Sequence, residues 1–173
     1  MELAGKHAVV CGSSQGIGLS TAKLMAERGA KVTLVGRNEI KIIAAMRSLH
    51  QADGVQHDYI IADFSEPTQV KEAISNYLKN GNNPTILVNN TGGPKGGLII
   101  DADITEFTST FNQHLVCNHI LVQALVPVMK KQGEGSIINV ISTSVKQPLN
   151  GLGVSNTIRG AVANWSKTLA NEL

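Results

Sequence analysis

Residues 7–18 read HAVVCGSSQGIG, and this stretch decides the fold class. Residues 7–11 are mostly apolar, as in a buried strand, and apolar positions at helical spacing predict a helix over 17–28. Between them, Gly12, Gly16 and Gly18 follow a G-x3-G-x-G spacing. Such glycines allow a sharp turn and close backbone approach, while a helix N-terminus offers free N–H groups to a pyrophosphate. The stretch therefore predicts a dinucleotide-binding turn. The lysine followed by serine or threonine that is typical of an NTPase phosphate loop is absent from it, which argues against an NTPase.

The residues of this turn that we expect to contact the dinucleotide are Gly12, Ser14, Gln15, Gly16, Ile17 and Gly18.

Short apolar runs alternate with helical segments along the rest of the chain, which predicts an α/β fold with a doubly wound parallel sheet in three layers. The expected strands are 7–11, 31–35, 55–61, 85–88 and 136–141. The expected helices are 17–28, 38–52, 67–79, 104–131 and one that begins near residue 151. We expect the strand order 3-2-1-4-5 and one domain over residues 1–173.

Composition excludes several classes of protein. The chain has 15 Lys+Arg against 13 Asp+Glu, a net charge of +2 and 42% hydrophobic residues, which argues against a disordered chain or a nucleic-acid-binding arm. Apolar runs are far shorter than the ~20 residues that span a bilayer, and no leader peptide is recognisable, so we expect a cytoplasmic protein. Cys11 and Cys117 lack metal-ligand spacing and are expected to be buried; no metal site is expected.

Arg37 suggests which dinucleotide binds. The second expected strand ends in Val35-Gly36-Arg37-Asn38, where a carboxylate would favour NAD, and no carboxylate stands there. A guanidinium can instead pair with a 2′-phosphate, which favours NADP(H) over NAD(H). The alternative is a solvated arginine at the start of a helix.

Together with three further motifs, these residues resemble the short-chain dehydrogenase/reductase family, especially its 3-oxoacyl-carrier-protein-reductase-like members. Residues 11–18 resemble TGxxxGIG with Cys11 in place of threonine, and 89–92 (NNTG) resemble NNAG. Asp63 resembles the aspartate that meets the adenine, and residues 135–142 (GSIINVIS) resemble the strand that ends in the active-site serine. The resemblance implies a Rossmann-type fold, NAD(P)(H) as cofactor, and hydride exchange with a small carbonyl or alcohol substrate. It adds Asp63, Asn90, Thr91 and Gly92 to the expected cofactor site.

The family's catalytic Asn-Ser-Tyr-Lys tetrad is only partly present. The resemblance places the serine at Ser142, the tyrosine at Ser155, the lysine at Arg159 and the asparagine at His114. A serine hydroxyl is a far poorer proton donor than a phenol, and arginine does not exchange a proton near neutral pH. Arg159 can still bind ribose hydroxyls and place positive charge near a developing alkoxide.

The missing proton donor leaves alternatives open. His114, Lys146 or a water could deliver the proton, and His114 could equally be a packed core residue. Lys146 and Lys95 could form an anion site or simply be solvated, and Ser142 could be a loop cap. The function is then an oxidoreductase, a nucleotide-binding sensor or assembly subunit without turnover, or a non-redox enzyme on the same fold.

The resemblance also bears on the length of the chain and on its assembly. Family members continue with further strands after the fifth βα unit, so we expect either a fragment or a short chain that closes its sheet by oligomerisation. A homodimer or homotetramer through the helix 104–131 and the last helix is expected.

Overall fold

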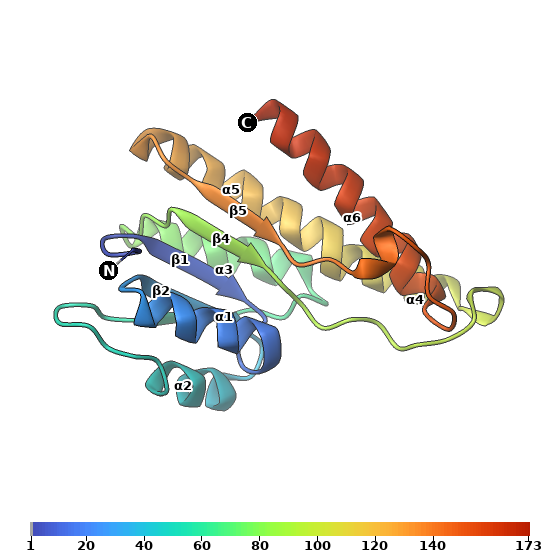
Figure 1. Ribbon diagram of the computed structural model, residues 1–173, viewed down its shortest axis with the longest axis horizontal. Coiled ribbons are helices and arrows are strands. Elements are labelled where there is room, and N and C mark those ends of the chain that lie inside the picture. Colours follow the sequence, from blue (N-terminus) through green and yellow to red (C-terminus); the bar gives the residue numbers. More distant parts are fainter. Residues whose placement is uncertain (1) are drawn as a thin grey trace.

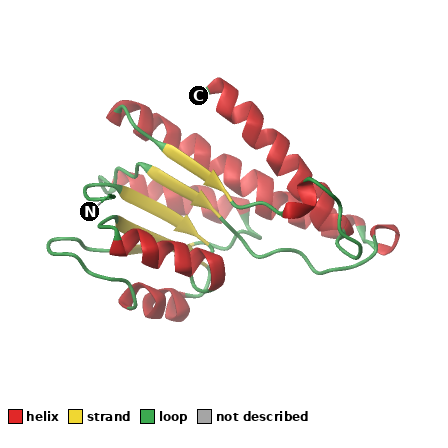
Figure 2. Cartoon of the chain, viewed as in Figure 1, coloured by secondary structure: helices red, strands yellow, loops and turns green. Residues whose placement is uncertain are grey.

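The computed structural model describes residues 2–173 and contains a parallel five-stranded sheet in the order β3-β2-β1-β4-β5, which confirms the expected order (Figure 1). The strands are β1 (His7–Cys11), β2 (Lys31–Gly36), β3 (Asp58–Ile61), β4 (Ile86–Asn89) and β5 (Ser136–Asn139). Their arrows all point the same way in Figure 2, so the carboxyl ends of the strands lie at one edge of the sheet. Ligands of such sheets bind at this edge.

Helices cover both faces of the sheet, as the three-layer prediction requires. They are α1 (Gly16–Glu27), α2 (Glu39–Arg47), α3 (Pro67–Lys79), α4 (Ile104–Phe111), α5 (Cys117–Gln132) and α6 (Gly153–Glu172). Side chains alternate along β1: Val9 packs in the core with α3 and α5, and Val10 packs in the core with α1 and α2. The two apolar cores hold the β1 backbone between them and thereby position the turn that follows it.

Four predicted elements differ clearly from the structure, and one of them is the strand expected over 136–141, which ends at Asn139. The helix expected over 104–131 is interrupted by a π-helical turn, η2 (Asn112–Val116), which separates α4 from α5. The strand expected from residue 55 begins only at Asp58, because the His57 ring nitrogen Nδ1 accepts the Val32 N–H at 3.1 Å in place of a backbone partner. The helix expected over 38–52 ends at Arg47, although Asn38 caps it as predicted, accepting the Lys41 N–H at 3.0 Å.

The structure confirms the predicted burial of the two cysteines and shows a partly exposed edge strand. Cys11 and Cys117 are fully buried, as expected, and burial raises the pKa of each thiol to about 12. On β5, which pairs with β4 alone, Ile138 is 46% exposed. Within residues 2–173, no helix has the length and apolar character that crossing a membrane requires.

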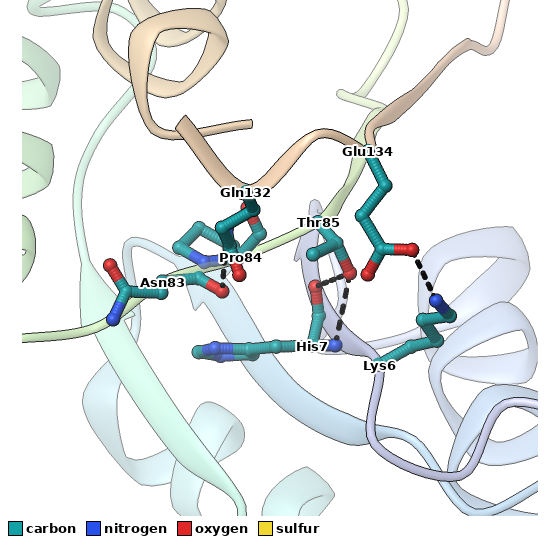
Figure 3. A network of polar contacts seen from close by, with 7 residues as sticks. All are labelled: Lys6, His7, Asn83, Pro84, Thr85, Gln132 and Glu134. Atoms are coloured by element: carbon teal, nitrogen blue, oxygen red, sulfur yellow. Dashed lines mark hydrogen bonds and ion pairs between the residues drawn. The ribbon is translucent and has the colours of Figure 1, made fainter. Parts of the chain in front are cut away.

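The amino-terminal edge of the sheet is held by structural contacts (Figure 3). Lys6 forms an ion pair with Glu134, and Gln132 Nε2 at the end of α5 donates to the Asn83 carbonyl at 3.3 Å. The His7 N–H donates to Thr85 Oγ1 at 3.3 Å. These contacts join the start of β1, the start of β4 and the end of α5, at the edge opposite the expected ligand site.

His7 also belongs to a buried triangle of polar side chains. Its Nε2 lies 2.9 Å from Thr33 Oγ1 and 2.9 Å from Tyr77 Oη, and these two oxygens are 2.5 Å apart. Burial, with a further effect from Lys31, lowers the pKa of His7 to about 4. His7 is therefore neutral in the folded protein at pH 7, and Tyr77 is committed to this structural cluster.

We expect stability to fall as the pH is lowered from about 6.5 to about 4, because the unfolded chain binds a proton at His7 in this window and the folded chain does not. Above pH 6.5 this contribution is fully present. The loss should be about 1–3 kcal/mol, measured by urea unfolding at a series of pH values. His7→Asn should make the slope shallower without removing it, because His114, whose pKa burial also lowers to about 4, contributes over the same window. The exposed His50→Gln should not change the slope; an unchanged slope in His7→Asn would contradict the assignment.

Candidate active site

The glycine turn after β1 has the geometry that a bound diphosphate needs. Gly12 and Gly16 have φ of +57° and +58°, a conformation that other residues rarely adopt. A Cβ on Gly18 would lie 2.3 Å from the Gly12 carbonyl oxygen, so the first turn of α1 packs directly on the loop. Glycine is therefore required at both ends of the turn, for different reasons.

Two side chains hold this turn in place. The buried Ser13 Oγ accepts the Val35 N–H at 3.0 Å and ties the loop to the end of β2. Asn90 Nδ2 donates to the carbonyls of Cys11 at 3.2 Å and Gly12 at 3.4 Å, from the loop after β4. Ser13 was not among the sequence-predicted residues, since a serine in a loop carries no signal of its partner.

The N-terminus of α1 is left open to a ligand. Its N-cap residue Gln15 makes no side-chain hydrogen bond to the helix, and the first turn contains no acidic residue. The first N–H groups of a helix have no partner within the helix and carry partial positive charge. This turn therefore fits the pyrophosphate of a dinucleotide.

A cleft of about 480 Å³ opens beside this turn along the carboxyl ends of β1, β2, β3 and β4. It brings together most of the residues predicted to bind cofactor: Gly12, Ser14, Gln15, Gly16, Ile17, Arg37, Asp63, Asn90, Thr91 and Gly92. Gly18 does not line it and acts through the packing described above. Phe64 and Gln113 also line the cleft and were not predicted. They come from segments without a motif, so only the fold reveals them.

Arg37 and Asp63 face each other across one end of the cleft. Arg37 Nη1 lies 3.8 Å from Asp63 Oδ2, and the arginine side chain is 74% exposed. Burial raises the pKa of the Asp63 carboxyl, but hydrogen bonds from Ser65 and the positive charge of Arg37 outweigh it and leave the pKa lowered. Asp63 is therefore ionised at neutral pH, and Arg37 remains accessible to a ligand.

Arg159 lies behind the wall of the cleft, with 9% of its surface exposed. Its Nη1 donates to the Val140 carbonyl after β5 at 2.8 Å, and its Nη2 to the Thr91 carbonyl after β4 at 3.5 Å. The guanidinium thus joins the loops that follow the two strands. Within residues 2–173 no carboxylate forms an ion pair with it.

His114 is 1% exposed and lies in the π-helical turn η2. Burial and the nearby charge of Arg159 lower its pKa to about 4, against an opposing contact with the Gly92 backbone, so the ring is neutral at pH 7. Among the described residues, none lies within hydrogen-bond distance of its Nε2. The structure thus brings His114 and Arg159 together but makes His114 a weak source of protons at neutral pH.

Ser142 and Ser155 are both half-buried and lie between His114 and Arg159 in the sequence. Ser142 Oγ accepts the Ser144 N–H at 3.1 Å and caps the short helix η3 (Thr143–Val145), so Ser142 is a cap residue. This contact uses the oxygen as an acceptor and leaves the hydroxyl proton available to donate. Ser155 lies in the first turn of α6, four residues before Arg159 and on the same helix face.

The structure places the other candidates away from this cluster. Lys146 lines a separate hollow of about 500 Å³ with Lys167, and that hollow includes neither Lys95 nor any residue of the cleft. Tyr59 is on the surface, where its hydroxyl donates to Glu39 at 3.2 Å, and Tyr77 lies in the amino-terminal triangle. Neither tyrosine replaces the one missing at position 155.

A polar ladder that sequence reasoning missed joins the strands to α6. Asn89 Nδ2 donates to Asn139 Oδ1 at 2.8 Å, and Asn139 Nδ2 donates to Ser166 Oγ at 2.9 Å. These residues end β4 and β5, so the ladder fixes the spacing of the loops that carry Thr91 and Val140.

A doubly wound parallel sheet with a glycine turn at its carboxyl edge defines a Rossmann-type α/β protein. The short chain dehydrogenase family model matches residues 6–173, and the chain belongs to this family of oxidoreductases.

Relatives and solved structures agree with this assignment. The chain is 31% identical over 171 residues to 3-oxoacyl-acyl-carrier-protein reductase FabG of Chlamydia trachomatis, covering 99% of this chain and 69% of that protein. It is 31% identical over 172 residues to Hydroxysteroid dehydrogenase-like protein 1 of Gallus gallus, covering 97% of this chain and 51% of that protein. The chain therefore spans between about half and two thirds of the length of these relatives.

Among solved structures, L-sorbose reductase from Gluconobacter frateurii complexed with NADPH and L-sorbose superposes with a TM-score of 0.92 at 33% identity, covering 99% of this chain and 65% of that one. A metagenomic short-chain oxidoreductase in complex with NADP superposes with a TM-score of 0.90 at 28% identity, covering 100% of this chain and 78% of that one.

Proposed function

We propose that this chain is the cofactor-binding and catalytic part of an NADP(H)-dependent oxidoreductase that acts on a small carbonyl or alcohol substrate, with 3-oxoacyl compounds among the candidates. The observation that carries the proposal is the cleft, where the positive-φ glycines, the open N-terminus of α1 and the Arg37 guanidinium lie together. Each matches a part of the dinucleotide: the turn and helix match the pyrophosphate, and Arg37 matches a 2′-phosphate.

The side chains next to the cleft support carbonyl chemistry. A nicotinamide dinucleotide supplies or accepts a hydride when bound. In the direction of reduction, the Ser142 hydroxyl donates a hydrogen bond to the carbonyl oxygen, and Arg159 contributes positive charge where that oxygen becomes an alkoxide. Arg159 also holds the loops after β4 and β5 at a fixed spacing.

The proton that completes the alcohol comes from water in this proposal. His114 is neutral at pH 7 and its Nε2 has no partner among the described residues, so we do not assign it the role of proton donor. We do not assign this role to Lys146, because it lines a different hollow. Turnover should therefore be slow relative to an enzyme with a tyrosine at this site.

NADPH fluorescence titration and NADPH oxidation test the proposal. Binding is followed by fluorescence, and turnover with a panel of carbonyl compounds is followed at the NADPH absorbance, using the full-length protein. NADPH binding with slow oxidation is expected. Absence of affinity for both NADPH and NADH would refute the proposal.

A second candidate is a nucleotide-binding protein without turnover, and the positions of Tyr59 and Tyr77, neither of which lines the cleft, favour it. Tight NADPH binding with no oxidation of any carbonyl compound would support this candidate over the enzyme. Assembly as a homodimer or homotetramer through α5 and α6, and a cytoplasmic location, belong to either version, and light scattering tests the assembly.

Arg37→Gln should weaken NADPH binding about tenfold and leave NADH binding nearly unchanged, because only NADPH carries the 2′-phosphate that the guanidinium would pair with. The dissociation constants of both cofactors are measured by fluorescence. The exposed Arg47→Gln, at the end of α2, is the matched control and should change neither. Equal weakening for NADPH and NADH would assign Arg37 a structural role instead.

A further inference from the structure

The side-chain amide of Gln113 has no partner in the protein and lies at the cleft. Gln113 is half-buried, lines the cleft, and comes from the π-helical turn η2 between α4 and α5. In the described part of the chain, residues 2–173, no hydrogen bond involves this amide. A primary amide has one oxygen that accepts hydrogen bonds and an NH₂ group that donates two. These groups are therefore available to a ligand in the cleft.

Neighbouring contacts place Gln113 at the end of the cleft that Asp63 and Phe64 form. Cys117, four positions after Gln113, donates from Sγ to the Phe64 carbonyl at 3.3 Å. The charge of Asp63 contributes to the raised pKa of the Cys117 thiol, so this carboxylate is also close to the start of α5. Residues four positions apart in a helical segment lie on one face. Gln113, Asp63 and Phe64 all line the cleft, and Gln113 faces it from the side of α5.

This end of the cleft is next to the group that would bind the 2′-phosphate. Arg37 Nη1 lies 3.8 Å from Asp63 Oδ2. In NADPH the 2′-phosphate and the adenine are attached to the same ribose, so a cofactor that pairs its 2′-phosphate with Arg37 carries its base into the same region. Phe64, which is 8% exposed, adds an apolar surface there. Gln113 is then the polar side chain that faces the base from the helical side.

We propose that Gln113 recognises the base of the cofactor, with its amide contacting the 6-amino group and N7 of adenine together. The proposal rests on the proposed function of the same cleft and adds a specificity-determining residue to it. A glutamine amide matches this edge of adenine, because its oxygen accepts from the amino group while its NH₂ donates to N7. A base with a 6-oxo group presents two acceptors at this edge, so the amide can satisfy only one of them.

NADPH and its hypoxanthine analogue, deamino-NADPH, test the proposal, because they differ only in the 6-substituent of the base. Both carry the fluorescent dihydronicotinamide, so the Kd of each is measured by the same fluorescence titration. We expect the wild-type protein to bind NADPH at least about tenfold more tightly. Gln113→Met has a side chain of similar length without the amide, and it should lower this ratio of Kd values by at least about fivefold. A smaller preference should remain, since the ionised Asp63 also accepts hydrogen bonds.

Two further measurements distinguish base recognition from a packing effect. Gln113→Glu keeps the oxygen that accepts from the amino group and removes the donor to N7, so both cofactors should bind less tightly while the ratio stays at or above the wild-type value. Adenosine 2′,5′-bisphosphate, which lacks the nicotinamide half, is titrated in competition with NADPH. Gln113→Met should weaken its binding by the same factor as that of NADPH. Gln123→Met, on the exposed side of α5 and outside the cleft, is the matched control and should change neither value.

The outcomes separate this proposal from the proposed function. A wild-type protein that binds neither NADPH nor NADH would refute both. Tight NADPH binding with equal Kd values for the two analogues, or with an unchanged ratio in a folded Gln113→Met, would overturn the role of Gln113 and leave the cofactor site intact. A loss of the ratio in Gln123→Met would also overturn it. If circular dichroism shows that Gln113→Met is unfolded, Gln113→Glu decides the question, and a ratio below the wild-type value would count against the proposal.

Discussion

Gly18→Ala is expected to raise the Kd for NADPH by at least about 100-fold, a loss of roughly 2.7 kcal/mol or more. The alanine Cβ would lie 2.3 Å from the Gly12 carbonyl oxygen and 2.8 Å from its carbon, both rigid backbone atoms, and 2.9 Å from Asn90 Nδ2. The glycine turn must therefore move away from the start of α1. The N–H groups proposed to bind the pyrophosphate would no longer point to one place.

Fluorescence titration with NADPH measures this effect, and urea unfolding shows that the variant is folded. Gly160→Ala is the control, because its Cβ would meet nothing within 4 Å and the residue lies inside α6. It should leave NADPH affinity unchanged and stabilise the helix by about 0.5–1 kcal/mol. A Gly18→Ala protein with wild-type affinity would show that the turn does not bind the diphosphate.

The parts of the fold that sequence patterns predicted are those set by local signals. Strand β1 and helix α3 have the predicted bounds, since an apolar run and a proline at the first helical position mark their ends. The boundaries that were wrong depend on distant contacts. The start of β3 is set by His57 accepting from Val32 on another strand, and no pattern in residues 55–61 carries that information.

Likewise, some features of the candidate site could be predicted from local sequence signals, and others depend on distant contacts. The glycine turn and Arg37 could be named from the sequence because spacing and strand position alone place them at the carboxyl edge. The environment of Arg159 could not, because its carbonyl partners come from two loops that are 49 residues apart in the sequence at Thr91 and Val140. His114 is 1% exposed and lies in a π-helical turn, where the sequence predicted a regular helix.

Ser155→Tyr should raise the rate of carbonyl reduction by about 100-fold or more, because a positioned general acid contributes a factor of this size. Ser155 lies four residues before Arg159 on α6, so a phenol there would project along the same helix face as the guanidinium. The nearby positive charge would lower the pKa of the phenol and make it a better donor near neutral pH. The rate is measured as kcat for NADPH oxidation with the best substrate of the wild-type protein.

Ser155→Phe is the matched control for this variant, because it adds the same ring without the hydroxyl. It should give no increase, which separates proton transfer from a packing effect. Combining Ser155→Tyr with Ser142→Ala should remove most of the gain, since the phenol can protonate the oxygen only while Ser142 holds the carbonyl in place. If Ser155→Tyr keeps its NADPH affinity but gains no rate, a proton donor is not what the site lacks, and the nucleotide-binding protein without turnover becomes the better description.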